Sequence, residues 1–108
     1  MKHHPKVLIV GGLARPIILQ RIRRVFSDVA VQWISTRECD PSSSSFRSAI
    51  LREETCLVVV LYGLIRHQHA HDIAKLARLH GKRVLYLRRS PNPERIRQAL
   101  SDIVGVAR

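Results

Sequence analysis

The sequence predicts one α/β domain over residues 1–108, built on a four-stranded parallel sheet in the order 2-1-3-4 with helices on both faces. Three observations predict it. Short apolar runs, typical of strands buried on both faces, alternate with segments whose apolar residues recur at helical spacing. The links between them are short, which favours parallel strands joined by right-handed crossovers. The length of 108 residues and the apolar fraction of 45% suit a single globular domain.

The first strand is predicted over residues 6–11, a continuous apolar run that closes with Gly11 and Gly12. A helix follows, and Pro16 suits its first turn, where the missing N–H is not needed. The apolar stripe of this helix recurs at helical spacing and comprises Ile18, Ile22, Val25 and Phe26.

A second strand is predicted over residues 29–34. The polar stretch after it ends in Asp40 and the serines 42–45, whose side-chain oxygens can cap the free N–H groups of a helix. We therefore expect a short helix from Phe46 to about Glu53. It is the least strongly patterned element of the chain.

The third strand, residues 57–62, is rich in β-branched side chains and ends at Gly63. A helix is predicted over about 68–80, with Gly81 in the position of a C-terminal capping glycine. The fourth strand covers residues 83–87 and a turn over 90–94 leads into the last helix. The apolar stripe of that helix is Ile96, Leu100, Ile103 and Val104.

Charge is the first indication of function. Nineteen Lys and Arg side chains oppose eight Asp and Glu, which gives a formal net charge of +11. The excess lies in residues 1–27 and 57–108, whereas residues 28–56 carry a small negative charge. Most of the basic residues are Arg, whose planar guanidinium can bind phosphate or carboxylate through two parallel hydrogen bonds. This pattern favours a polyanionic partner, and the alternatives are a solvated basic surface or a face that docks on an acidic protein.

The predicted strands nominate a binding site, because ligands of open α/β sheets bind beyond the carboxyl ends of the strands. An Arg follows every predicted strand, and helix N-termini at the same edge add N–H donors. Tyr62, at the end of the third strand, could stack on a base, but the scarcity of aromatic residues argues against a single-strand stacking platform and fits phosphate-backbone contacts better. We expect an anion-binding rim formed by Gly11, Gly12, Arg15, Arg37, Ser43, Arg66, His67, Arg88 and Arg89.

Several known site types do not fit. Gly11 and Gly12 form neither a dinucleotide-binding fingerprint nor a P-loop, and Arg37 stands where an NAD site has an acid. No nucleophile with a neighbouring base can be identified, so the sequence favours a non-catalytic module without a cofactor. His67 and His71 share a helical face with His69 nearby, yet zinc needs three or four ligands, so polar histidines near the rim are the simpler interpretation.

Further predictions concern packing and location. The aromatic residues predicted to lie in the core are Phe26, Trp33, Phe46 and Tyr86. Cys56, which begins an apolar run, is also predicted to lie in the core. Cys56 and Cys39 are interpreted as reduced thiols in a cytoplasm. No apolar run is long enough to cross a membrane and no signal peptide is expected. An open sheet also has two free edges, so a homodimer or larger complex is a further expectation.

A sparse pattern runs along nearly the whole chain. Gly11 and Gly12 follow the first strand, His67 follows the third, and Lys82 and Arg88 flank the fourth. With this pattern the chain resembles the small bacterial domains gathered as the domain-of-unknown-function family numbered 2325. In that family the His is preceded by Ser, where this chain has Arg66, and cysteines that often follow the third strand are missing here. The resemblance implies a Rossmann-like or flavodoxin-like fold and no particular activity.

We therefore expect a basic module that binds nucleic acid through phosphate contacts at the carboxyl edge of its sheet, with Arg21, Arg23 and Arg24 flanking the rim. One alternative is a sensor or regulatory subunit for a nucleotide or another phosphate-bearing small ligand. The other is an interaction subunit that docks on an acidic protein. DNA and RNA are not distinguished by the sequence, since it contains no known base-reading motif.

Overall fold

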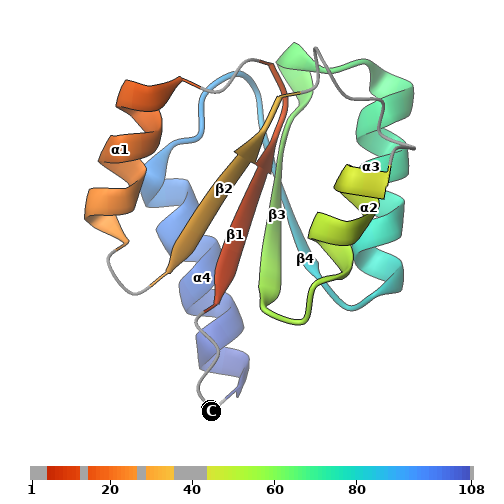
Figure 1. Cartoon of the computed structure of the whole chain (residues 1–108). Coiled ribbons are helices and arrows are strands. Elements are labelled where there is room, and N and C mark those ends of the chain that lie inside the picture. The colour runs from red at the N-terminus through yellow and green to blue at the C-terminus, as the bar shows by residue number, and fades with distance from the viewer. Residues whose placement is uncertain (1–4, 13–14, 27–28, 36–43, 108) are drawn as a thin grey trace.

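The computed structural model describes residues 5–12, 15–26, 29–35 and 44–107, and side chains within 44–46 and 104–107 are left out of the description. The described part confirms the predicted fold, a parallel sheet in the order β2-β1-β3-β4 (Figure 1). The strands are β1 (Lys6–Val10), β2 (Ala30–Ile34), β3 (Thr55–Leu61) and β4 (Arg83–Leu87). The helices are α1 (Pro16–Val25), α2 (Ser44–Leu51), the short 3₁₀ turn η1 (Tyr62–Leu64), α3 (His67–Leu79) and α4 (Pro93–Ala107).

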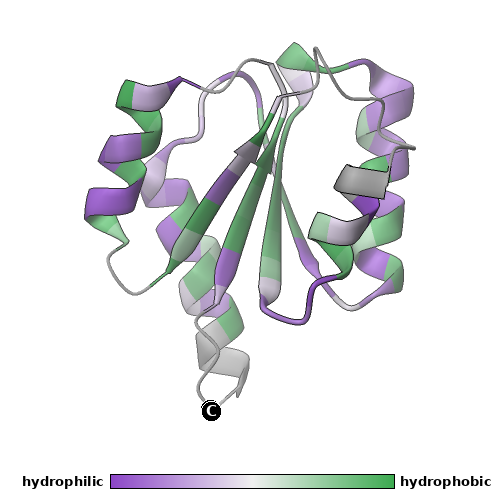
Figure 2. Ribbon diagram, in the orientation of Figure 1, coloured by the Kyte–Doolittle hydropathy of each residue, from purple (hydrophilic) through white to green (hydrophobic). Residues whose placement is uncertain are grey.

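Two hydrophobic cores lie on opposite faces of the sheet, which makes a three-layer sandwich. Alternate residues of β1 face opposite ways, so Val7 and Ile9 pack into one core while Leu8 and Val10 pack into the other. Helices α1 and α4 cover the first face, and α2 and α3 cover the second (Figure 1). Figure 2 shows mostly apolar central strands between helices in which hydrophilic and hydrophobic residues alternate.

The edge strands are less buried than the central strands, and this corrects part of the predicted core. Tyr86 on β4 is 40% exposed, with the Arg78 guanidinium 5.7 Å from its ring centre. The prediction that Tyr86 is a core residue is therefore wrong, because β4 is an edge strand. Trp33 on the other edge is only half-buried, whereas Phe26 is buried as predicted. The side chain of Phe46 lies outside the description.

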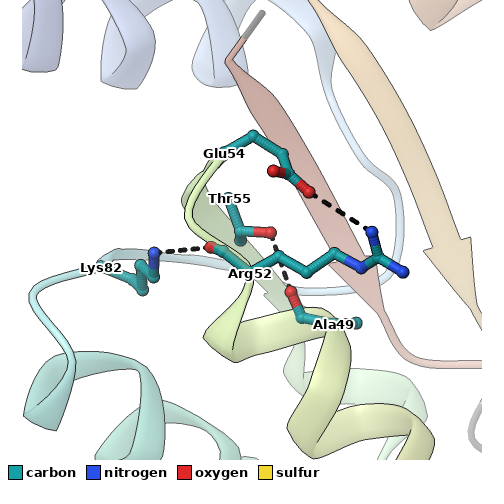
Figure 3. Close-up of polar contacts among 5 residues, drawn as sticks. All are labelled: Ala49, Arg52, Glu54, Thr55 and Lys82. Carbon is teal, nitrogen blue, oxygen red and sulfur yellow. Dashed lines mark hydrogen bonds and ion pairs between the residues drawn. The ribbon is translucent and has the colours of Figure 1, made fainter. Parts of the chain in front are cut away.

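The amino ends of the strands are connected by polar contacts (Figure 3). Strand β3 begins at Thr55, two residues earlier than predicted. The buried Thr55 hydroxyl donates to the Ala49 carbonyl oxygen at 2.8 Å, which ties the strand to α2. Lys82 Nζ donates to the Arg52 carbonyl oxygen at 2.8 Å, and the Arg52 guanidinium lies 3.6 Å from the Glu54 carboxylate. These bonds hold the α2–β3 and α3–β4 links together.

Cys56, the next residue of β3, is half-buried rather than part of the core. Its thiol donates to the Lys6 carbonyl oxygen at 3.6 Å. Burial raises the pKa of this thiol above its ordinary value, although backbone hydrogen bonding to the sulfur and the charge of Lys82 act in the opposite direction. At neutral pH the group is therefore a protonated, weakly nucleophilic thiol. Cys39 lies outside the described residues.

Within the described ranges, none of the helices is both long and apolar enough to cross a lipid bilayer.

Candidate anion-binding rim

The carboxyl ends of the four strands meet at one end of the molecule, at the upper edge of the sheet in Figure 1. Arg15 directly precedes α1 and Arg66 directly precedes α3, while Arg88 and Arg89 follow β4. All four side chains are exposed, as is His67 at the start of α3. The topology therefore assigns these five predicted site residues to the same end of the sheet. Arg37 and Ser43, the other two predicted side chains, lie outside the described residues.

The two glycines after β1 have a structural explanation of their own. Both have positive φ angles, +134° at Gly11 and +64° at Gly12. A Cβ atom added at Gly11 would lie 2.8 Å from Leu61 Cβ, and one at Gly12 would lie 2.9 Å from Leu64 Cδ1. The close approach to the end of β3 thus requires glycine at Gly11, and the left-handed φ favours glycine at Gly12, whether or not a ligand binds there.

Trp33 fixes the same loop from the other side. Its indole N–H donates to the Gly11 carbonyl oxygen at 2.9 Å, and the Gly11 N–H donates to the Ile34 carbonyl oxygen at 3.4 Å. The loop after β1 is therefore held between β2 and β3. Sequence reasoning identified Trp33 only as a core residue, because nothing in a linear pattern shows that an indole N–H reaches a carbonyl twenty-two residues away.

The turn after β3 lies directly against the loop after β4. The Gly63 N–H donates to the Arg88 carbonyl oxygen at 2.6 Å. A Cβ atom added at Gly63 would lie 2.6 Å from that oxygen and 3.0 Å from Arg89 Cγ. Glycine is needed at Gly63 for this contact, which fixes η1 beside the backbone that carries Arg88 and Arg89.

An open surface hollow of about 550 Å³ lies at the end of β4 and the start of α4. Its lining is Leu87, Arg88, Arg89, Ser90, Asn92, Pro93 and Arg95. The hollow adds Arg95 to the candidate site, a residue that the sequence analysis missed. Its position in the first turn of the last predicted helix, at the same sheet edge as the other arginines, was the signal that could have identified it. The Asn92 carboxamide oxygen caps this helix by accepting from the Glu94 N–H at 2.9 Å.

The arginines at this end have no acidic partner among the described residues. We call Arg15, Arg66, Arg88, Arg89 and Arg95 the rim arginines. None of them forms an ion pair with a carboxylate that the structure describes. The carboxylates of Glu94 and Asp72 lie near the starts of α4 and α3, and Asp72 accepts a hydrogen bond from the Gln68 amide at 3.1 Å. The local excess of positive charge is therefore considerable.

The histidines of α3 do not form a metal site with other described residues. His67 and His71 are exposed and His69 is half-buried. In the part of the chain with described positions, no three His, Cys, Asp or Glu side chains are grouped so that they could hold a metal ion.

Comparison with known proteins adds no relative: no protein-family model matches the chain, and no curated protein matches it. The resemblance to the domain-of-unknown-function family numbered 2325 stays a prediction.

Proposed function

We propose that this chain is a non-catalytic module that binds nucleic acid through phosphate contacts at the carboxyl end of its sheet. The observation that carries the proposal is the set of five exposed rim arginines without a described acidic partner. Two of the loops that bear them are fixed in place by backbone hydrogen bonds and close glycine contacts. Such an arrangement favours a partner that carries many phosphates over one that carries a single charge.

The chemistry of arginine supports phosphate as the group that is bound. A guanidinium presents donors in a planar fork that matches two phosphate oxygens, and it keeps its charge at any physiological pH. Because a guanidinium is more weakly hydrated than an ammonium, an arginine loses less hydration energy than a lysine when it binds phosphate. The net charge of +11 adds long-range attraction for a polyanion. We place this function in the cytoplasm, where thiols stay reduced.

A salt titration tests the proposal. Fluorescence anisotropy with labelled single-stranded DNA, duplex DNA and RNA is measured at several salt concentrations. We expect submicromolar binding to at least one of them at low salt. If all five rim arginines contact phosphates, the slope of log K against log salt is about −4. Weak binding at every salt concentration, or tight binding with a flat salt dependence, would contradict the proposal.

A second candidate function is supported by the hollow at the start of α4. Its volume of about 550 Å³ lies within the range of small-ligand sites, and it has three arginines and Ser90 in its lining. A sensor for a nucleotide or another small phosphate ligand would use this hollow. Such a ligand raises the melting temperature by mass action, with a modest salt dependence. A thermal-shift series with mononucleotides and inorganic phosphate separates this candidate from the first.

A further inference from the structure

We propose that the rim binds an unpaired nucleotide, whose base stacks on Tyr62 while its phosphate is held by Arg88 and Arg89. This inference rests on the proposed function and narrows its substrate class to single-stranded nucleic acid. The inference is based on an exposed aromatic ring and two guanidinium groups, which belong to adjoining loops.

Tyr62 is 42% exposed and begins the 3₁₀ turn that ends β3. The other described aromatic side chains are placed differently. Phe26 is buried, the indole of Trp33 is bonded to the loop after β1, and Tyr86 lies on the edge strand β4. Among the described residues, Tyr62 is the exposed aromatic side chain on a turn that follows the carboxyl end of a strand, whereas Tyr86 lies within β4.

The backbone places the turn that carries this ring beside the loop that carries the two arginines. Tyr62 is bonded to Gly63, whose N–H donates to the Arg88 carbonyl oxygen at 2.6 Å. The lack of a side chain at Gly63 lets the turn approach the Arg89 stem, which a Cβ would meet at 3.0 Å. Leu64, the residue after Gly63, is 40% exposed. It packs against Gly12, where an added Cβ atom would lie 2.9 Å from Leu64 Cδ1. The turn that carries Tyr62 and Leu64 thus lies next to the loop of Arg88 and Arg89, whose guanidinium groups pair with no described carboxylate.

A nucleotide has this same pairing of properties, since it joins a flat aromatic base to a charged phosphate. Base stacking on an aromatic side chain needs a base whose face is free. In a duplex the faces of the bases are covered by their neighbours, whereas a single strand exposes them. With one ring at the rim, the site takes one base and its flanking phosphates, and the affinity of a longer strand comes from further phosphate contacts.

The test compares two exposed tyrosines. Tyr86 is the matched control, because it is 40% exposed and has Arg78 nearby but lies on the edge of the sheet. Binding of a labelled single strand and of its duplex is measured by anisotropy for the parent, Tyr62→Leu, Tyr62→Phe and Tyr86→Leu. We expect Tyr62→Leu to weaken single-strand binding about tenfold and to leave duplex binding unchanged. Tyr62→Phe keeps the ring and the affinity, and Tyr86→Leu has no effect.

Two further ligands separate the sources of binding. A single-stranded polymer of abasic deoxyribose phosphate offers charge without bases, so Tyr62→Leu should not change its affinity. Adenosine monophosphate as a competitor shows whether one free nucleotide is sufficient or whether a strand is required. If Tyr62→Leu and Tyr86→Leu behave alike, or the duplex binds as tightly as the single strand, the inference is wrong while phosphate binding stands. If none of the polyanions binds with salt dependence, the proposed function is itself wrong and the inference falls with it.

Discussion

The two ends of the parallel sheet use their charged side chains differently. At the amino end, Arg52 lies 3.6 Å from the Glu54 carboxylate, Arg83 lies 3.6 Å from the Asp102 carboxylate, and Lys82 donates to a carbonyl oxygen. At the carboxyl end, the rim arginines have no such partners among the described residues. Three charged side chains at the amino end therefore have partners within the protein, whereas the rim arginines pair with no described carboxylate.

The loops at the carboxyl end are nevertheless well fixed, by backbone contacts rather than by ion pairs. Gly11 and Gly63 allow two loops to approach their neighbours closely, and the Trp33 indole bonds to the first of them. This division shows how a short chain can leave many like charges exposed on one end. Main-chain hydrogen bonds and apolar packing supply the order there, so the guanidinium groups are not needed for it.

Replacing Gly11 by Ala should have the largest effect on stability. The added Cβ would lie 2.8 Å from Leu61 Cβ, and the φ of +134° is unfavourable for any other residue. We expect Gly11→Ala to lower the free energy of unfolding by about 3 kcal/mol, measured by urea denaturation. Gly81→Ala is the control, because Gly81 also has a positive φ but open space around it. Its cost should be about 1 kcal/mol, and equal losses would show that the close approach to β3 is unimportant.

At the amino end, Thr55→Val should have the next largest effect. The substitution removes the hydroxyl that donates to the Ala49 carbonyl oxygen and leaves that oxygen without this partner. We expect a loss of about 2 kcal/mol in urea denaturation. Thr55→Ser keeps the hydroxyl and loses one methyl group, which costs about 1 kcal/mol. A Thr55→Val variant as stable as the parent would show that this bond contributes nothing.

Much of the fold could be predicted from the sequence, because strands buried on both faces have continuous apolar runs and the intervening helices have clear stripes. The burial of side chains on the edge strands was harder to predict. Tyr86 was predicted to be buried, but burial on an edge strand depends on which helices cover it, and a linear pattern does not contain that information. The buried hydroxyl of Thr55 was missed for a related reason, since its acceptor belongs to a different element.

The site was predicted in part. The rule that ligands bind beyond the carboxyl ends of parallel strands placed Arg15, Arg66, Arg88 and Arg89 together, and the topology agrees. Arg95 was missed because it comes eight residues after β4. The glycines were predicted as ligand contacts, which stays a prediction, and the structure gives them a packing reason of their own.

The smallest effect concerns the Cys56 thiol. Because burial raises its pKa, its labelling by iodoacetamide should reach half of the maximal rate at a higher pH in the folded protein than in urea. By the same linkage, the stabilising contribution of this thiol is complete below its unfolded pKa and declines as the pH rises through the folded value. A Cys39→Ser background leaves Cys56 as the labelled thiol. Coinciding pH profiles in the folded and unfolded protein would contradict the raised pKa.

We propose that the two ends of the sheet differ in function, and a pair of double variants distinguishes them. Arg88→Ala with Arg89→Ala removes two charges from the rim, and Arg52→Ala with Arg83→Ala removes two from the amino end, so the net charge falls equally in both. Anisotropy with one labelled single strand is measured over a range of salt concentrations. We expect the rim variant to lose about tenfold or more in affinity, with a salt slope shallower by about 1 to 2. We expect the amino-end variant to bind nearly as the parent does. Equal losses in the two variants would mean that net charge alone attracts the polyanion, which would contradict the assignment of the rim as the binding site.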